Sequence, residues 1–352
     1  MVQQQIDQAD LLILGDIGGT NCRLSLWKGS ECCFTEYYLA EEYDLFEHIV
    51  DAFMDLCTAR LALMQESEKL VKIDSNSAPS IRHACLAVAG RVDRGRVYLT
   101  NLNWQLSEDD LSERIGCQTY LVNDVYAQAL AVSKSSANDR IHLSGPTDID
   151  PKKTMVVLGV GTGLGEALLI PCNQKDEPYY HAVATEGGHA RFAPRNESEI
   201  GLMRWLVGLY GSHISVERVV SGQGLVNIYR YLLGGRALPD LFDNRLNGEM
   251  ISYAALELND ELCMRALEIF VSVLADEAAN LVLKCDAATV CLSGGIPPKI
   301  IPAFHAYFSS AFLDKGRFRN TLAQVGVWIM NDPKLGLKGA YLTVEERCQA
   351  TL

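Results

Sequence analysis

Apolar residues in this chain occur in short runs that predict buried strands, and glycine or polar residues follow each run. The run from Leu11 to Leu14 is wholly apolar, which is typical of a strand buried on both faces. Gly18 and Gly19 interrupt it, and polar and apolar residues then alternate over residues 23–28, as in a second strand. The two glycines therefore join strand to strand, which predicts a hairpin turn.

The first part of the chain continues as strands and helices in succession, which is the pattern of an α/β layer. We expect further strands at residues 32–39, 82–90, 92–104 and 119–122. We expect helices at residues 45–64 and 125–133, and a short helix opened by Ser107-Glu108-Asp109-Asp110, which resembles a capping box. The polar residues 65–80 predict a loop.

A polar stretch over residues 135–153, which carries a Gly-Pro and an Asp-Pro pair, predicts the break between two lobes. The opening pattern then returns, because the apolar residues 154–160 precede a glycine-rich turn at 161–165 and a strand at 166–171. This weak repeat predicts two similar lobes that face one cleft.

The elements predicted after the repeat complete both lobes. We expect strands at 289–292 and 325–330, helices at 199–210, 222–233, 260–283 and 337–346, and a turn over residues 184–194. The small α/β domain is placed at residues 1–134 plus 334–352, and the large α/β domain at residues 135–333.

The composition is typical of two globular domains, and the net charge excludes some classes of binding partner. The 352 residues are 48% hydrophobic and 21% charged, which is typical of folded domains with sizeable cores. The net charge of -13 argues against a nucleic acid or an acidic membrane as partner. The negative charge does not exclude an anionic nucleotide as ligand, because backbone dipoles and a metal ion can hold phosphate groups.

The eleven cysteines are irregularly spaced, with no CxxC pair and no zinc-like spacing, which predicts reduced thiols and a cytoplasmic protein. Pairing of some of them is the alternative. Residues 1–10 lack the basic region of a signal peptide, and no run of about 18 apolar residues predicts a membrane span.

Three glycine-rich turns follow apolar strands, and together they indicate a bound nucleotide. They are Gly18-Gly19, the turn at 161–165 and Gly294-Gly295. Bare glycines let backbone N–H groups approach phosphates closely, and the third turn is expected near the base. The pattern GxxxxGKS or GxxxxGKT is absent, and GxGxxG fails. For the first turn, an ordinary Gly-Gly hairpin is the alternative.

Residues beside the first turn could complete a phosphate and metal site. Thr20 and Asn21 add side-chain donors. Asp16 is placed to hold a hydrated Mg²⁺ through water, so no direct protein ligand to the metal is expected.

Asp124 is the best candidate for a general base. It ends a predicted strand, where a carboxylate could take the proton of an attacking hydroxyl. Asn123 could hold the same substrate; the alternative is that Asn123-Asp124 is simply a helix N-cap pair. Glu186, His189 and Glu217 could bind vicinal hydroxyls of a polyol, whereas His189 in isolation would more often be structural.

The chain resembles the bacterial-type glucokinase family. The resemblance is carried in order by DIGGTN (16–21), LVNDVYA (121–127), GVGTGLG (159–165), EGGHARFAP (186–194), VERVVSGQGLVNIY (216–229), LSGGI (292–296) and DKGRF (314–318). It implies a two-lobed, hexokinase-type fold of the actin-like ATPase (ribonuclease H-like) superfamily, with an interdomain cleft. It also implies ATP- and Mg²⁺-dependent phosphorylation of glucose on its 6-hydroxyl, which feeds glycolysis, and a homodimer.

The resemblance also implies roles for particular residues. Asp124 would be the base. The sugar would be bound by Asn123, Asp124, Glu186, His189 and Glu217. The nucleotide would be contacted by Gly15, Asp16, Ile17, Gly18, Gly19, Thr20, Gly161, Thr162, Gly163, Gly294 and Gly295.

The departures from the family pattern are modest. Tyr126 stands where the family often has Thr or Glu, and Gln223 where Pro or Arg is common. Residues 190–210 hold no cysteine, so the structural zinc of the related repressor–kinase family is not expected. Two rival readings stay open: a non-catalytic, chaperone-like or sugar-sensing member of the superfamily, and a kinase for another hexose or an amino sugar. The anomer preference and the donor (ATP, ADP or polyphosphate) stay open too.

Overall fold

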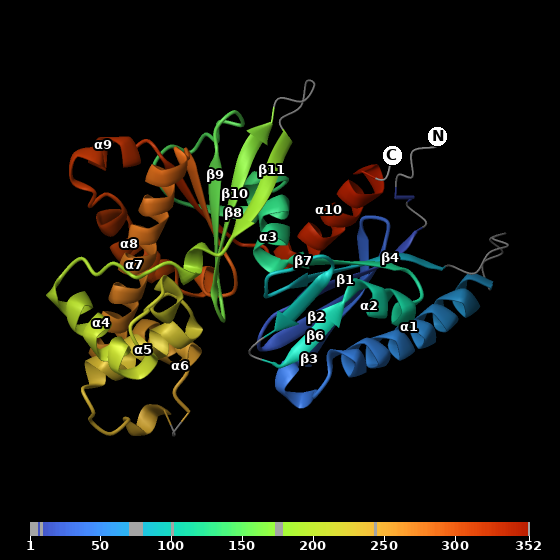
Figure 1. Ribbon diagram of the computed structural model, residues 1–352, viewed down its shortest axis with the longest axis horizontal. Coiled ribbons are helices and arrows are strands. Elements are labelled where there is room, and N and C mark those ends of the chain that lie inside the picture. Colours follow the sequence, from blue (N-terminus) through green and yellow to red (C-terminus); the bar gives the residue numbers. More distant parts are fainter. Residues whose placement is uncertain are drawn as a thin grey trace. The chain divides into compact units, whose positions relative to one another are not determined.

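The computed structural model describes residues 6–7, 10–69, 80–99, 102–172, 179–242 and 245–350. Contacts between Cα atoms divide the chain into two compact units. Unit 1 comprises Met1–Ala131 and Lys334–Leu352, and unit 2 comprises Val132–Pro333. Each unit contains its own sheet and its own core (Figure 1).

Unit 1 is built on a five-stranded sheet with the order β3-β2-β1-β4-β7. The strands are β1 (Leu11–Ile17), β2 (Asn21–Lys28), β3 (Glu31–Leu39), β4 (Ile81–Val88) and β7 (Gln118–Asn123). The first three pair antiparallel, and β1, β4 and β7 run parallel. The predicted hairpin at Gly18 and Gly19 is confirmed.

Helices cover both faces of this sheet, because successive side chains of a strand point to opposite faces. From β1, Leu11 and Ile13 enter the core under α1 (Phe46–Lys69) and α2 (Glu108–Ile115). Leu12 and Leu14 pack instead with α3 (Asp124–Ser133) and α10 (Leu335–Ala350). Figure 1 shows α1 and α10 on opposite faces. The apolar run of β1 is thus buried on both sides, as its sequence predicts.

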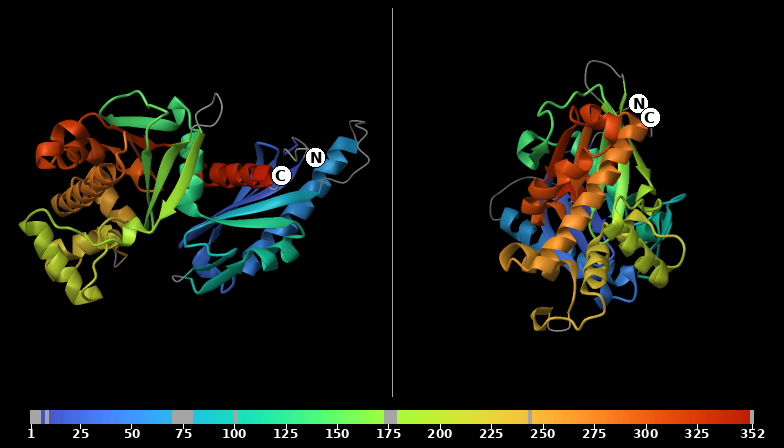
Figure 2. Two further views of the ribbon diagram at one scale, coloured as in Figure 1. Left: turned by 45° about the horizontal axis from the view of Figure 1, so that its top comes forward. Right: turned by 90° about the vertical axis from the view of Figure 1, so that its left-hand side faces the viewer.

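Unit 2 is built on a six-stranded sheet with the order β11-β10-β9-β12-β13-β8. The strands are β8 (Arg140–Ser144), β9 (Met155–Val160), β10 (Leu164–Cys172), β11 (Tyr179–Thr185), β12 (Thr289–Ser293) and β13 (Gly326–Met330). The helices are α4 (Glu197–Tyr210), α5 (Gly222–Leu233), α6 (Gly248–Glu257), α7 (Glu261–Cys285), α8 (Ile301–Phe312) and the short α9 (Arg319–Leu322). Helices α7 and α8 pack against each other, and residues of α4 to α8 share one core with the sheet (Figure 2).

The two sheets repeat one strand order. In each, three antiparallel strands (β3-β2-β1 and β11-β10-β9) are followed by two strands that continue parallel to the last of them. Unit 2 adds β8 antiparallel to β13. The repeat that the sequence indicates weakly is therefore present in the topology of the two units.

Several sequence-based expectations were wrong in detail. Helix α1 continues to Lys69, so the polar stretch does not begin a loop at residue 65, and residues 70–79 lie outside the described part. The strand expected at 92–104 is a separate hairpin of β5 (Arg96–Leu99) and β6 (Trp104–Ser107). The predicted linker contains β8, whose residues are all half-buried and so lack the alternation that marks a strand.

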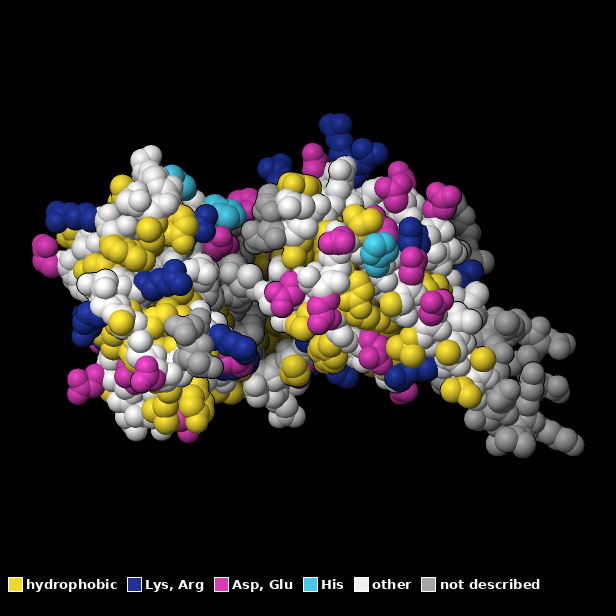
Figure 3. Space-filling view, turned by 90° about the horizontal axis from the view of Figure 1, so that it is seen from below, with side chains coloured by type: hydrophobic (Ala, Val, Ile, Leu, Met, Phe, Trp, Pro, Cys, Tyr) yellow, Lys and Arg dark blue, Asp and Glu magenta, His cyan; other side chains and the backbone are white. Residues whose placement is uncertain are grey.

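Five strands and helices of unit 2 were not predicted: β8, β11, α6, α8 and the short α9. For α8, a signal was available, because Phe304, Phe308 and Phe312 recur at the four-residue helical spacing and are buried. In the described ranges, no helix is long and apolar enough to cross a membrane. The face drawn in Figure 3 carries basic and acidic side chains interspersed.

Candidate active site

The carboxyl ends of the parallel strands in unit 1 meet at one sheet edge. Register aligns Ile17 of β1 with Val88 of β4, and Val88 with Asn123 of β7. The backbone N–H of Ala89 donates a 2.9 Å hydrogen bond to the Ile17 carbonyl oxygen, which ties the ends of β1 and β4 together. The Gly18-Gly19 turn and Asp124 therefore leave the sheet at the same edge.

Asn123 is fixed by two side-chain hydrogen bonds at this edge. Its Nδ2 donates to the Gly90 carbonyl oxygen at 3.1 Å, and its Oδ1 accepts from the Tyr126 backbone N–H at 3.0 Å. The second bond caps the N-terminus of α3, so the N-cap alternative is correct for Asn123. The cap also fixes the position of Asp124, which begins the helix.

Asp124 is half-buried in the first turn of α3. Its Oδ1 accepts a 2.8 Å hydrogen bond from the Val125 backbone N–H. A general base must reach the hydroxyl it deprotonates, and a carboxylate held at a strand–helix junction has a fixed position from which it could do so.

Asp16 lies on β1 and forms an ion pair with Arg23 of β2. Its carboxyl group also lies close to Gly336 in the first turn of α10, where an added Cβ would stand 2.7 Å from Asp16 Oδ2. A carboxylate oxygen is the donor type that Mg²⁺ accepts directly or through water, so Asp16 fits the role expected of it.

The predicted nucleotide residues of β1 and its turn differ in accessibility. Ile17 is fully buried, and a side chain at Gly15 would collide with Leu24 and Leu86. Both residues are buried, so neither offers a side chain to a ligand. Gly18 and Gly19 are half-exposed and Thr20 is exposed, so the turn itself can receive a phosphate.

In unit 2, two glycine turns adjoin at the end of β9. The Gly161 N–H donates to the Gly163 carbonyl oxygen at 2.9 Å and closes the first turn. Gly294 has φ +92°, and a side chain there would collide with the Val160 backbone. The Ile296 N–H donates to that same Val160 carbonyl oxygen at 3.2 Å. The prediction that these turns belong to one site is consistent with this contact.

Two further glycines join the cluster and were missed from the sequence. The Gly222 N–H donates to the Gly161 carbonyl oxygen at 2.8 Å, and a Cβ at Gly248 would stand 3.1 Å from the Gly222 carbonyl oxygen. Both glycines begin helices, after the N-caps Ser221 and Asn247. The Ser-Gly and Asn-Gly pairs were the available signal, because each combines an N-cap residue with a bare backbone.

Glu217 lies against the first of these turns. It belongs to a 3₁₀ turn (Val216–Arg218), and its Oε2 accepts a 3.0 Å hydrogen bond from the Leu164 N–H. Gly163 has no room for a side chain, because a Cβ would press on Glu217 Oε2. Glu217 is half-buried, so its carboxylate is partly open to a ligand.

Glu186 and His189 flank a second 3₁₀ turn (Gly187–His189), which begins directly after β11. His189 Nε2 lies 3.8 Å from Glu186 Oε2, and the two side chains are 60% and 55% exposed. A side chain at Gly188 would collide with the Leu164 carbonyl oxygen, so this turn lies on the start of β10. The structure thus anchors the turn of Glu186 and His189, and also Glu217, at Leu164.

The candidates therefore fall into two sets. Unit 1 holds Asp16, the Gly18-Gly19 turn, Asn123 and Asp124, and unit 2 holds the glycine cluster with Glu186, His189 and Glu217. Each set combines backbone N–H groups suited to phosphate with carboxylates or amides suited to hydroxyl groups. Such a combination suits transfer of a phosphoryl group to a polyol.

Solved structures define the class of fold. A glucokinase from Balamuthia mandrillaris, crystallised with glucose, matches over 95% of this chain and 93% of its own, with a TM-score of 0.73 and 22% identity. A glucokinase of the ROK family from Streptomyces griseus, crystallised with glucose and AMPPNP, matches over 95% of this chain and 98% of its own, with a TM-score of 0.64 and 20% identity. The chain has the two-unit α/β fold of these solved structures.

Sequence comparison gives the family. A profile of the family described as Glucokinase matches residues 13–347. The glucokinase of Nostoc punctiforme is 35% identical over 353 aligned positions, which cover 94% of this chain and 98% of that protein. The chain belongs to the glucokinase family, whose members are hexose phosphotransferases.

Proposed function

We propose that this protein transfers the γ-phosphoryl group of ATP to the 6-hydroxyl of D-glucose and so supplies glucose 6-phosphate to glycolysis. The observation that carries the proposal is the shared sheet edge in unit 1. There, the Gly18-Gly19 turn leaves β1 and Asp124 leaves β7, two parallel strands that lie on either side of β4. Transfer of a phosphoryl group to a hydroxyl needs a carboxylate and a phosphate-binding turn on one rigid frame.

In this proposal Asp124 accepts the proton of the 6-hydroxyl as the oxygen attacks. General-base catalysis of this kind contributes about 10²–10⁴-fold to the rate. Asn123 keeps Asp124 in register through the α3 cap and offers its remaining hydrogen-bonding capacity to the sugar. Glu186, His189 and Glu217 bind the other hydroxyl groups of the same sugar.

The phosphates of ATP are received at the glycine turns of residues 18–20 and 161–163, where the bare backbone lets them approach closely. The ATP analogue in the Streptomyces griseus structure supports a nucleotide of this kind. Mg²⁺, carried by the nucleotide, would neutralise phosphate charge, and Asp16 would hold it through water.

We place the adenine base beside Gly294-Gly295 and the start of α6. A surface depression of about 300 Å³ at the start of α6 is lined by Leu241, Glu249, Met250 and Tyr253, and Glu249 follows Gly248 of the glycine cluster directly. Lys299, three residues beyond Ile296, forms a 2.9 Å ion pair with Glu249, which connects the third glycine turn to this depression.

A panel of phosphoryl acceptors and donors tests the proposal. We would assay the purified protein with glucose, mannose, fructose, glucosamine and N-acetylmannosamine, each with ATP, ADP or polyphosphate. We expect the highest kcat/KM with glucose and ATP, and loss of activity in EDTA that excess Mg²⁺ restores. Glucose binding without turnover would favour a sugar sensor, and a higher kcat/KM with another sugar would reassign the substrate.

Assembly and location are carried forward as proposals. We propose a homodimer, for which light scattering should give twice the chain mass of 38.8 kDa. We propose a cytoplasmic protein, because all eleven cysteines lie in the described part and each is a free thiol there.

A further inference from the structure

Glu166 is an acidic residue buried inside unit 2 without a partner. It lies on β10 and is 1% exposed. Within the described part of the chain, neither of its carboxyl oxygens has a hydrogen-bond partner. Burial of an unpartnered carboxyl group is unfavourable, so its presence beside the candidate site requires an explanation.

The Glu166 carboxyl group lies directly beneath the turn that carries Glu186 and His189. A side chain at Gly187 would overlap Glu166 Oε2, so the carboxyl group fills the space under that glycine. The side chain of Thr185 also links the backbone of Glu166 to the backbone of the turn. Thr185 Oγ1 donates to the Glu166 carbonyl oxygen and accepts from the Gly187 N–H, each at 3.2 Å. The Glu166 carboxyl group under Gly187 therefore supports the turn together with the Leu164 carbonyl oxygen under Gly188.

The charged groups that face Glu166 come from α7. Burial, with a smaller contribution from the negative charge of Glu277, raises the pKa of Glu166 from 4.5 to about 8, and Lys284 opposes this rise. Lys284 Nζ lies 3.8 Å from Glu277 Oε1, and Asn280 donates to Glu277 Oε2 at 3.0 Å, so the groups on α7 are engaged with one another.

The remaining titratable groups near Glu166 are few. Burial raises the pKa of the Cys285 thiol on α7, and Glu166 contributes to that rise. The turn itself carries only Glu186 and His189. Glu217 faces Leu164, two residues before Glu166 on the same strand.

We propose that Glu166 is a positioning residue for the sugar: as a neutral acid it supports the turn of Glu186 and His189, and its ionisation displaces that turn and weakens glucose binding. The inference rests on the proposed function, in which Glu186 and His189 bind the sugar.

The turn is the element that yields when Glu166 ionises. A carboxylate in this position must gain water or N–H donors, because an unpaired buried charge is strongly unfavourable. Strand β10 is held by hydrogen bonds to β9 and β11 on its two sides, and α7 lies in the core. The turn is exposed, since Glu186 and His189 are 55% and 60% accessible. Ionisation should therefore raise the glucose KM while kcat, set by Asp124, changes little.

Glucose kinetics and calorimetric glucose binding without ATP, both from pH 6.5 to 9.5, test this for the wild type and Glu166→Gln. The glutamine has the size of the neutral acid and cannot ionise. We expect the wild-type KM and Kd for glucose to rise above about pH 8, by at most about tenfold per pH unit for one linked proton. We expect both to stay flat in Glu166→Gln, at the wild-type value of pH 7.

Glu277→Gln provides a second variant that leaves Glu166 in place. It removes a negative charge that opposes ionisation of Glu166, so the rise in glucose KM should move to lower pH. Near-UV circular dichroism checks that each variant is folded. If Glu166→Gln is unfolded, the test rests on whether Glu277→Gln moves the rise in glucose KM to lower pH.

Two results would overturn the inference while leaving the proposed function intact. One is a wild-type glucose KM that is flat to pH 9.5 with normal turnover. The other is the same rise in KM in the wild type and in the folded Glu166→Gln variant. Failure of the wild type to bind or phosphorylate glucose at any pH would overturn the proposed function and this inference together.

Discussion

The backbone N–H of Leu164 donates a 3.0 Å hydrogen bond to the carboxylate of Glu217. Leu164 closes the turn proposed to receive phosphate, and Glu217 is proposed to bind sugar. The bond therefore links the proposed phosphate site to the proposed sugar site inside unit 2. Gly163, in the same turn, also lies against Glu217, because any side chain there would press on Glu217 Oε2.

Gly163→Ala and Gly161→Ala should therefore weaken the binding of different substrates, glucose and ATP respectively. In Gly163→Ala, the added methyl group displaces Glu217 and breaks its bond to Leu164. Hydrogen bonds to charged groups contribute about 1.5–3 kcal/mol, so we expect a glucose KM raised about tenfold or more. At Gly161, nothing lies within 4 Å of an added Cβ, so the ATP KM should rise while the glucose KM and the stability stay near wild type.

Gly208→Ala on α4 is the control for both variants, because an added Cβ there also meets nothing within 4 Å. Steady-state KM values for the two substrates, with melting temperatures, measure the effects. An equal rise of both KM values in Gly163→Ala would contradict the separation of roles.

Asp124→Asn should abolish proton acceptance without unfolding the protein. The amide oxygen can still accept from the Val125 N–H, but it cannot take a proton, so we expect kcat to fall about 10²–10⁴-fold. Asp109→Asn is a matched control, since Asp109 also lies in the first turn of a unit 1 helix and is exposed. Turnover within a few-fold of wild type in Asp124→Asn would remove Asp124 from the role of base.

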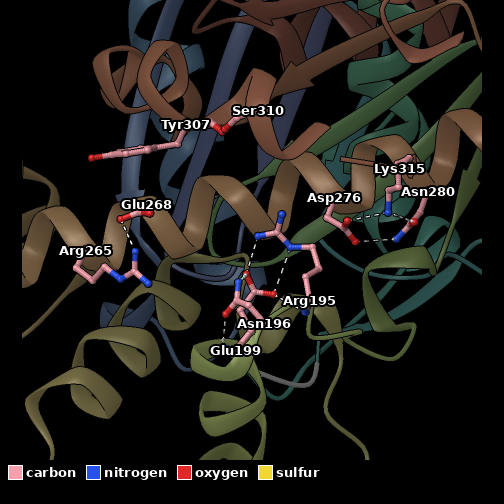
Figure 4. A network of polar contacts seen from close by, with 10 residues as sticks. All are labelled: Arg195, Asn196, Glu199, Arg265, Glu268, Asp276, Asn280, Tyr307, Ser310 and Lys315. Atoms are coloured by element: carbon pink, nitrogen blue, oxygen red, sulfur yellow. Dashed lines mark hydrogen bonds and ion pairs between the residues drawn. The ribbon is translucent and has the colours of Figure 1, made fainter. Parts of the chain in front are cut away.

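Lys315→Met should destabilise unit 2 strongly. Lys315 Nζ lies 2.7 Å from Asp276 Oδ1 and 2.7 Å from Asn280 Oδ1, and the ion pair is 16% and 11% exposed (Figure 4). Removing one partner of a buried pair leaves the other charge unpaired, at about 3–5 kcal/mol.

Glu268→Gln is the control on α7, the helix that carries Asp276 and Asn280, the partners of Lys315. It breaks the ion pair between Arg265 and Glu268, whose side chains are 45% and 36% exposed (Figure 4). We expect the free energy of unfolding to fall by about 1 kcal/mol or less. Urea unfolding gives both values. Equal destabilisation by the two variants would show that burial does not set the strength of these pairs.

Glu166→Gln should alter how stability depends on pH. The folded-state pKa of Glu166, about 8, lies above its ordinary value of 4.5, so its contribution to stability is fully present below pH 4.5 and is lost as pH rises to about 8. The variant lacks this loss. As the pH rises within that window, the free energy of unfolding of the variant should increase relative to that of the wild type by up to about 1.4 kcal/mol per pH unit.

Urea titrations at pH 5, 6.5 and 8 check this prediction. A difference between wild type and variant that is the same at all three pH values would mean that Glu166 does not retain its proton in the folded protein.

Much of the fold followed from local pattern. The apolar run of β1 and the alternation of β2 predicted the hairpin, and Ser107 accepts from the Asp110 N–H as its position before α2 indicated. Prediction failed where an element lacks its own periodicity. Strand β8 has half-buried residues throughout, and its place beside β13 depends on a partner almost 190 positions later in the sequence.

The sequence alone determined which residue types could do the chemistry and where the backbone had to be bare. Strand and turn periodicities are local, so Gly18-Gly19, Gly294-Gly295, Asn123 and Asp124 could be assigned to strand ends without coordinates.

The tertiary structure decided which of them share a frame. Gly222 and Gly248 join the turn at Gly161 through contacts between segments distant in sequence. Glu166 gave no signal in the sequence, since an acid in a strand is usually solvated. Only packing of β10 under the turn and against α7 shows that this one is buried, because burial is set by segments far apart in the chain.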